Sequence, residues 1–311
     1  MGRYKVYMVI RKKETELALA MVNKNSRIID QGQLDLIDKE GLKPHIYMVL
    51  TRPKSSIVKD SINIDDNHFS GIIEVHYPER TEKIKFKERH YFGTKNVRIE
   101  TKYPFNSFKL IDNDNEETIL ECMVSWFLQS VNESKHALPM KVVYVGQSYG
   151  DCGERKVDKR LISHSTLQKI YFEILSYEPD KEVQLYVSEF SCELVGTNIK
   201  ASRPSDINYF QHDADDLINH RLVINLVEAT LIRYFQPQYN EKFKNKFPSQ
   251  EHVSYREAYE LDFNMLRVEV GSPYERFCLL FSDSVEAKWH HICEYHFYSL
   301  NERKCMFDFS E

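Results

Sequence analysis

Short runs of β-branched and aromatic residues dominate the first 112 residues, and they constrain the fold more than any other feature of the chain. Clusters of Asp, Asn, Gly and Pro separate them, a pattern typical of strands joined by turns. The runs are YKVYMVI, LALAMVN, HIYMVLT, GIIEVHY, IKFKERHYF and NVRIETKY. The sequence therefore predicts a β-rich N-terminal domain over residues 1–112, for which we consider a role in target recognition.

Helical periodicity comes next along the chain. The segment EETILECMVSWFLQSV, residues 116–131, has apolar residues at helical spacing, which predicts a helical connector over 113–139. Two further helices are expected at about 156–175 and about 215–235, and the second should stop before Pro237, which cannot continue a helix.

Strands are expected between and after these helices. One covers residues 141–146, a second is KEVQLYVSEF, and the last two are MLRVEVG and RFCLLFS. This order predicts a domain over 140–248 and a small C-terminal α/β extension over 249–311.

Composition narrows the class of protein. The 311 residues are 42% hydrophobic, which suits compact domains, and the net charge of −5 coexists with basic runs such as ERKVDKR. No signal peptide and no apolar run of membrane-spanning length is visible, so we expect a cytoplasmic protein without a membrane partner. The six cysteines are scattered without a CxxC pair, which favours buried thiols over disulfides.

Six residues between 140 and 246 form a recognisable series. A tyrosine stands beside a glycine at the end of the strand in VVYVGQS, an arginine and a histidine lie one helical turn apart in KRLISH, a glutamate falls inside NLVEATLIRYF, and an asparagine closes FQPQYN. They are Tyr144, Gly146, Arg160, His164, Glu228 and Asn240. In this order and spacing the segment resembles the GIY-YIG nuclease family over about a third of the chain.

The resemblance implies an α+β fold with a small central sheet flanked by helices, and a metal-dependent endonuclease. Tyr144, Arg160 and Glu228 would converge on a scissile phosphate, with Glu228 holding one divalent cation, Mg²⁺ or Mn²⁺. His164 would assist catalysis, and Asn240 closes the motif. Gly146, Asn240, Lys156 and Lys159 are the residues expected to contact the substrate. Double-stranded DNA is favoured over RNA, restriction or phage defence is the context suggested by analogy, and a homodimer stays open.

The same residues suit phosphodiester hydrolysis on chemical grounds. The guanidinium of Arg160 is a planar fork of donors that matches two phosphate oxygens. The Glu228 carboxylate is a hard oxygen ligand suited to Mg²⁺. Tyr144 and His164 can relay the proton lost by an attacking water.

One part of the family pattern is missing. A first signature strand with its own tyrosine should lie shortly before Tyr144, but residues 132–143, NESKHALPMKVV, contain no tyrosine. Tyr149 and Tyr103 are candidates for the vacant place, and Tyr149 ranks first because it lies near the motif in sequence.

Simpler explanations exist for each residue. Tyr144 fits the core of a strand, Arg160 fits a surface ion pair with Asp158 or Glu154, and Asn240 fits a turn. Glu228 is harder to explain in this way, because a carboxylate beside an apolar helix face costs free energy unless it is paired or bound to metal. Two other functions therefore stay open, a nucleic-acid-binding module without catalysis and a protein-interaction scaffold.

Two other segments carry metal-ligating residue types. The spacing in HHICEYHFYSLNERKC matches no closed zinc site, although it contains His290, His291, Cys293, His296 and Cys305. The acidic run HDADD, residues 212–216, is better explained as the start of a helix, where negative charge is stabilising.

Overall fold

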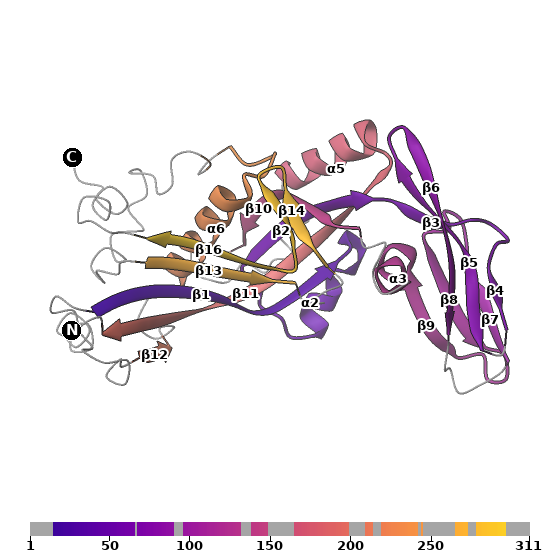
Figure 1. Ribbon diagram of the computed structural model, residues 1–311, viewed down its shortest axis with the longest axis horizontal. Coiled ribbons are helices and arrows are strands. Elements are labelled where there is room, and N and C mark those ends of the chain that lie inside the picture. Colours follow the sequence, from indigo (N-terminus) through magenta and orange to yellow (C-terminus); the bar gives the residue numbers. More distant parts are fainter. Residues whose placement is uncertain are drawn as a thin grey trace.

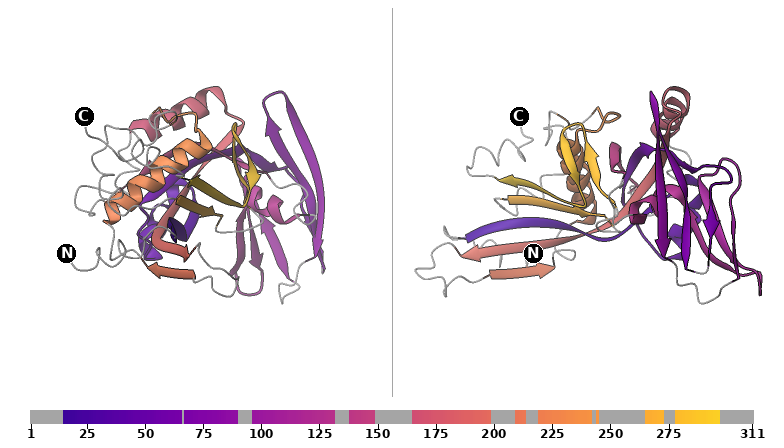
Figure 2. Two further views of the ribbon diagram at one scale, coloured as in Figure 1. Left: turned by 60° about the vertical axis from the view of Figure 1, so that its left-hand side comes forward. Right: turned by 45° about the vertical axis from the view of Figure 1, so that its right-hand side comes forward.

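The computed structural model describes residues 15–65, 67–89, 96–131, 138–148, 165–198, 209–213, 219–241, 244, 265–272 and 278–296. The fold is mixed α/β and rich in strands (Figure 1). A large curved sheet with helices packed on it forms one part, and a smaller set of strands with a short helix forms a second part beside it (Figures 1 and 2).

The described strands of the larger part form one nine-stranded sheet. Its order is β15-β14-β10-β2-β11-β1-β13-β16, and β12 pairs with β11 outside this path. The bounds are β1 (Thr15–Ile29), β2 (Ile46–Pro53), β10 (Met140–Gln147), β11 (Lys181–Asn198), β12 (Tyr209–Asp213), β13 (Met265–Gly271), β14 (Leu280–Ser282), β15 (Val285–Lys288) and β16 (His290–His296). Strand β2 runs antiparallel to both of its neighbours, β10 and β11.

The sheet curls until its two ends nearly meet. The end strands β15 and β16 are separated in sequence only by Trp289. His291 in β16 fixes this corner, since its Nε2 lies 3.0 Å from the Leu280 carbonyl oxygen in β14 and 3.1 Å from that of Lys288 in β15.

Helix α6 (His220–Phe235) lies against the concave face of the curled sheet and contacts β2, β10, β11, β13 and β16. Ten of its sixteen residues are buried, so the helix is apolar on most sides. It begins at Asn219, whose side chain accepts a hydrogen bond from Arg221 N, and ends at Gln236 in the left-handed conformation just before Pro237. The helix expected over about 215–235 is thus present from His220 onward.

Helix α5 (Ser165–Tyr177) covers the opposite face of the same strands. Its buried residues Leu167, Ile170 and Ile174 pack with apolar residues of β2 and β11 in a second core. The one-turn helix α2 (Asp35–Lys39) and the 3₁₀ turn η1 (Gln31–Gln33) border this core.

The smaller part is inserted between β2 and β10, and we call it the inserted unit, residues 55–131. It contains a sheet of β3 to β6, a sheet of β7 to β9, and helix α3. The bounds are β3 (Ser55–Ile57), β4 (Asn63–Ile64), β5 (His68–Tyr77), β6 (Arg80–Arg89), β7 (Val97–Glu100), β8 (Ser107–Asp112), β9 (Thr118–Met123) and α3 (Val124–Ser130). Aromatic residues of both sheets and α3 pack in its core, including Phe69, Phe86, Phe108 and Phe127.

Arg52 joins the inserted unit to the curved sheet. It is almost fully buried near the end of β2, where its Nε donates to Glu182 of β11 at 2.5 Å and its guanidinium donates to Ser125 of α3 at 2.6 Å. The guanidinium also lies 4.6 Å from the centre of the Trp126 ring. One donor of this buried charge is thus satisfied on each side of the junction, whereas the buried Nη1 has no hydrogen-bond partner among the described residues.

These pairings correct the predicted domain boundaries. Strands β1 and β2 belong to the curved sheet with β10 and β11, so residues 1–112 are not one domain, and the central sheet is large and not the small one expected. Residues 118–123 of the predicted connector form strand β9, and its described helix, α3, covers Val124–Ser130. Local residue types predict strands well, but they do not specify which distant strand becomes the partner.

Candidate functional site

The sequence motif maps to the C-terminal end of β10, where the strand pairs with the beginning of β2. Gly146 lies opposite Tyr47, and Gln147 lies opposite Ile46. A register shift between Val142 and Tyr144 interrupts the ladder. As a result Val143 and Tyr144 both pack toward α5, whereas Val142 and Val145 pack toward α6.

Two tyrosine rings lie against Gly146 on the α5 face. The ring centres of Tyr47 and Tyr144 are 6.0 Å apart. A Cβ atom placed on Gly146 would come 2.6 Å from the Tyr47 hydroxyl oxygen and 2.8 Å from a carbon of the Tyr144 ring. Glycine is therefore required here by close approach of the rings. Tyr47 is fully buried and Tyr144 is half-buried.

Tyr171 of α5 and Tyr239 pack in the same core as this pair. Burial raises the pKa of Tyr171, and the negative charge of Asp30 raises it further. Burial, with a hydrogen bond to Glu173, raises the pKa of Tyr239 to about 12. The phenols of these two residues therefore stay protonated at neutral pH and can donate hydrogen bonds.

Glu228 lies on the other face of β10. Gln147 Nε2 donates to a Glu228 carboxylate oxygen at 2.7 Å and to Asn225 Oδ1 at 2.9 Å. Asn225 and Glu228 are three residues apart in α6 and hence on the same side of the helix. This cluster places a carboxylate and a carbonyl-type oxygen together at the end of the strand.

Asn240 forms hydrogen bonds with the backbone of β10 beyond the point where the neighbouring strand β14 ends. Strand β14 pairs only with Met140 and Lys141. Beyond them, Tyr239 N donates to Val143 O at 3.0 Å. The Asn240 side chain then accepts from Val145 N at 2.9 Å and donates to Val145 O at 2.8 Å. Asn240 was expected to contact substrate, but its amide is used within the protein.

A histidine pair borders the same end of the sheet. Ser148 N donates to the His45 carbonyl oxygen at 2.8 Å, so His45, which precedes β2 in sequence, lies beside the end of β10 in space. The His45 ring lies 4.7 Å from that of His220, the first residue of α6. Burial lowers the pKa of His45, and the neighbouring His220 lowers it further.

Tyr144 and Glu228 thus lie on opposite faces of β10, because the first packs toward α5 and the second belongs to α6. The expectation that they point into one cleft is not supported by the side chains described here. Strand β10 ends at Gln147, so beyond this residue the strand no longer separates the two faces.

Several expected site residues lie outside the described part of the chain. They are Tyr149, Lys156, Lys159, Arg160 and His164. The other candidate for the missing tyrosine, Tyr103, belongs to the inserted unit and is 88% exposed. It lies in the segment between β7 and β8, away from the end of β10.

The sequence reasoning missed Tyr47. The run HIYMVLT predicts a strand, but it precedes VVYVGQS by almost a hundred residues, whereas the expected candidates Tyr103 and Tyr149 both lie nearer to the motif in sequence. The signal that could have found it is an isoleucine-tyrosine pair in a strand, followed by a stretch long enough to fold as a separate unit.

No cage of three or more His, Cys, Asp or Glu side chains is present among the described residues. Mg²⁺ does not need such a cage, because it is commonly held by one or two carboxylates, waters and substrate oxygens. Glu228 with Asn225 fits that donor set.

Three comparisons complete the description of the site. The chain matches no protein-family model, no curated protein and no solved structure. Separately, none of the helices in the described ranges has the length and apolar character needed to cross a bilayer.

Proposed function

We propose that this chain is a metal-dependent endonuclease that hydrolyses phosphodiester bonds of nucleic acid, with double-stranded DNA as the favoured substrate. The proposal combines the resemblance of residues 140–246 to the GIY-YIG nuclease family with the geometry at the end of β10. A role in restriction or phage defence is the biological context that the resemblance suggests.

The observation that carries the proposal is the position of Tyr47. The family pattern requires a tyrosine on a strand that precedes the one ending in Tyr144 and Gly146. Strand β2 precedes β10 in sequence, pairs with it directly, and places Tyr47 opposite Gly146. The inserted unit explains why this tyrosine is distant in sequence but adjacent in space.

Glu228 supports the metal requirement. A bound Mg²⁺ or Mn²⁺ would neutralise charge on the scissile phosphate and lower the pKa of a coordinated water. Glu228 and Asn225 would hold the ion, and Gln147 orients the carboxylate through its 2.7 Å hydrogen bond. Arg160 and His164 keep their predicted roles at the phosphate and in proton transfer.

Because the tyrosines and Glu228 occupy opposite faces, one phosphate could contact both only by lying across the strand end at Gln147 and Ser148. The full burial of Tyr47 favours a second candidate function, a nucleic-acid-binding module that retains the fold and does not cleave. The two candidates differ in whether bound DNA is cut.

The test is incubation of the purified protein with supercoiled plasmid DNA and, in parallel, with labelled single-stranded RNA. Each is tested with Mg²⁺, with Mn²⁺ and with chelator, and the products are separated on a gel. We expect cleavage of DNA with either metal and none with chelator.

The informative variant is Glu228→Gln, which keeps the side-chain volume and removes the charge. Cleavage should fall at least about a hundredfold, while DNA binding persists. Glu286→Gln is the matched control, since Glu286 is exposed on β15 and the change in charge is the same. Unchanged cleavage by Glu228→Gln would contradict the metal assignment, and binding without cleavage in either metal would favour the second candidate.

A further inference from the structure

Strand β6 of the inserted unit carries its lysines and its last arginine on one face. Its sequence, RTEKIKFKER, places Lys83, Lys85, Lys87 and Arg89 at alternate positions, all exposed. The intervening positions Ile84 and Phe86 are buried in the core of the unit. Since successive side chains of a strand point to opposite faces, the four cations share the outer face.

The partner strand β5 completes this surface, which we call the basic face. The four cations stand directly opposite Glu74, Ile72, Ser70 and His68, respectively. Glu74 pairs with Lys83 at 3.2 Å. For Lys85, Lys87 and Arg89, no ion pair is formed with any described residue.

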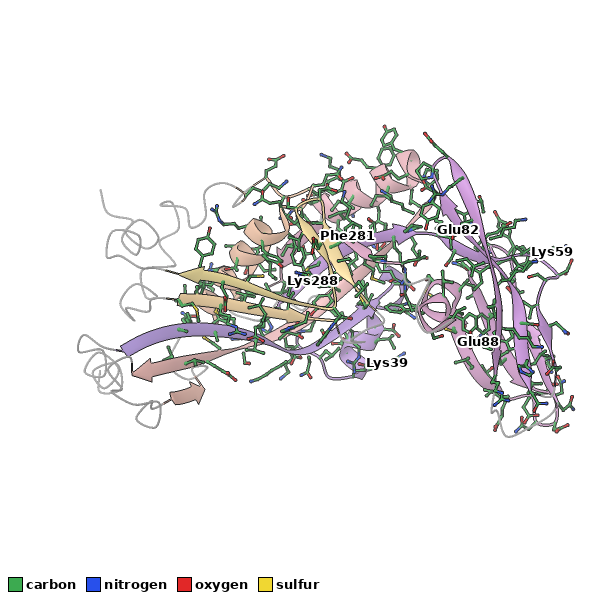
Figure 3. All side chains as sticks on the ribbon, in the orientation of Figure 1. Lys39, Lys59, Glu82, Glu88, Phe281 and Lys288 are labelled. Atoms are coloured by element: carbon green, nitrogen blue, oxygen red, sulfur yellow. The ribbon has the colours of Figure 1, made fainter. Side chains whose placement is uncertain are left out.

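The acidic residues of β6 are excluded from this surface. Glu82 and Glu88 alternate with the four cations along the strand, so they belong to the same face as the buried Ile84 and Phe86. In Figure 3 Glu82 and Glu88 lie toward opposite ends of the strand. The chain as a whole is acidic, with a net charge of −5, so a face with four cations and one acid departs from its average. Such a surface attracts a polyanion.

We propose that the basic face binds the phosphodiester backbone of nucleic acid and thereby holds the substrate for the site at the end of β10. The inference rests on the proposed function only in taking the bound nucleic acid to be the substrate. Binding itself requires no catalysis.

The dimensions agree with this partner. Alternate residues of a strand lie about 7 Å apart, so the four cations extend over about 20 Å, a length in which one strand of B-DNA carries about six phosphates. Strand β2 leads from Ile46, beside Gln147, to Pro53 at the inserted unit, a distance of about 25 Å. A duplex of about eight base pairs covers that distance.

Lysines on an edge strand also prevent pairing with other chains, and β6 is an edge strand because it pairs only with β5 among the described strands. The two roles respond differently to charge reversal. Glutamate is also charged and so still protects an edge, but it repels a phosphate backbone.

The experiment measures binding of a labelled duplex of about 30 base pairs, long enough to span both sites, by fluorescence anisotropy over a series of salt concentrations with chelator present. The test variant is Lys85→Glu/Lys87→Glu. The matched control is Lys59→Glu/Lys102→Glu, which changes the net charge equally at two exposed positions of the same unit outside the basic face. A second test variant, Lys85→Gln/Lys87→Gln, removes the charges without reversing them.

We expect the reversal to weaken binding at least about tenfold at low salt and to reduce the slope of log K against log salt by about 1.8, because each neutralised phosphate contributes about 0.9. The glutamine variant should show the same loss of slope, and the control should bind like the wild type. All variants should keep the wild-type melting temperature and remain monodisperse to the same degree.

Equal binding by the reversal and the control would overturn the inference, as would binding to vesicles of anionic phospholipid in place of DNA. Failure of this inference is distinguishable from failure of the proposed function. Salt-dependent binding through the basic face without any cleavage supports the inference and contradicts the nuclease. Metal-dependent cleavage that the reversal leaves unchanged contradicts the inference and supports the nuclease.

Discussion

The Asn240 side chain takes the place of a neighbouring strand for Val145: it accepts a hydrogen bond from Val145 N at 2.9 Å and donates one to Val145 O at 2.8 Å. Asn240 is 8% exposed, and Val145 is fully buried. The asparagine that closes the sequence motif thus holds β10 in position next to Gly146 and Gln147. Its contribution to any activity passes through the backbone of that strand.

Replacing Asn240 should therefore reduce stability before it affects binding. Asn240→Ala leaves a buried N–H and a buried C=O of Val145 without these partners, and we expect the free energy of unfolding to fall by about 2–4 kcal/mol. Asn240→Asp keeps the acceptor but loses the donor and should also destabilise. Urea denaturation measures both changes, and a wild-type midpoint for Asn240→Ala would contradict this role.

Gly146→Ala should be destabilising because the new methyl group meets the buried Tyr47 ring, whose nearest atoms lie 2.6 and 2.7 Å away. Overpacking of this kind costs about 1–3 kcal/mol. The cost should shrink in a Tyr47→Leu background, where the ring is gone. An equal cost in both backgrounds, measured by urea denaturation, would show that Tyr47 is not the cause.

The hydroxyls of Tyr47 and Tyr144 can be tested by phenylalanine substitution, which keeps the rings that pack around Gly146. If the phenols relay protons or contact the phosphate, cleavage by each variant falls by about 10²–10⁴-fold with little change in melting temperature. Tyr171→Phe is the matched control, since Tyr171 lies in the same core and its hydroxyl has no hydrogen-bond partner among the described residues. If all three variants behave alike, the rings are structural, and the binding module is favoured.

Much of the secondary structure follows from local sequence. The alternation in MLRVEVG predicts β13, and the apolar register of NLVEATLIRYF with Pro237 beyond it predicts α6 and its end. The arrangement of these elements does not follow locally. Strand β1 pairs with β11 across more than 150 residues, and β13 joins β1 in parallel, contacts that no local pattern encodes.

The site was predictable only where its residues are close in sequence. The sequence indicates Glu228 because a carboxylate borders an apolar helix face, and in the structure Glu228 accepts a hydrogen bond from Gln147. The role of Asn240 toward Val145 and the position of Tyr47 both depend on tertiary contacts. The bulge at β10 that sends Val143 and Tyr144 to the same face is likewise invisible in the sequence, and it separates Tyr144 from Glu228.

The junction at Arg52 should be strongly coupled to Glu182. Arg52→Met leaves the nearly buried Glu182 carboxylate without its partner, and the charge of nearby Asp30 repels it. We expect a loss of about 3–5 kcal/mol in the free energy of unfolding. Arg52→Met/Glu182→Leu removes both charges and should recover part of this loss. A double variant less stable than the sum of the single variants would contradict the coupling.

Buried histidines should make the protein less stable in mild acid. Burial lowers the pKa of His291 from its ordinary 6.5, and the charges of Lys288 and His290 lower it further, against the opposing effect of its two carbonyl contacts. Because Nε2 faces those carbonyl oxygens, it carries the ring proton, and Nδ1 accepts from the Tyr234 hydroxyl at 3.1 Å.

The sign of the effect follows from linkage between protonation and folding. Well above pH 6.5, His291 is neutral in both the folded and the unfolded chain, so it adds no pH dependence to the free energy of unfolding. As the pH falls below that value, the unfolded chain binds a proton that the folded chain does not, and the free energy of unfolding decreases until the lowered folded pKa is reached. His45, whose pKa is also lowered, acts in the same direction. The urea midpoint should therefore fall more between neutral pH and about pH 5.5 for the wild type than for His291→Gln. If His291→Gln shows the same fall as the wild type, another group is responsible for the acid sensitivity.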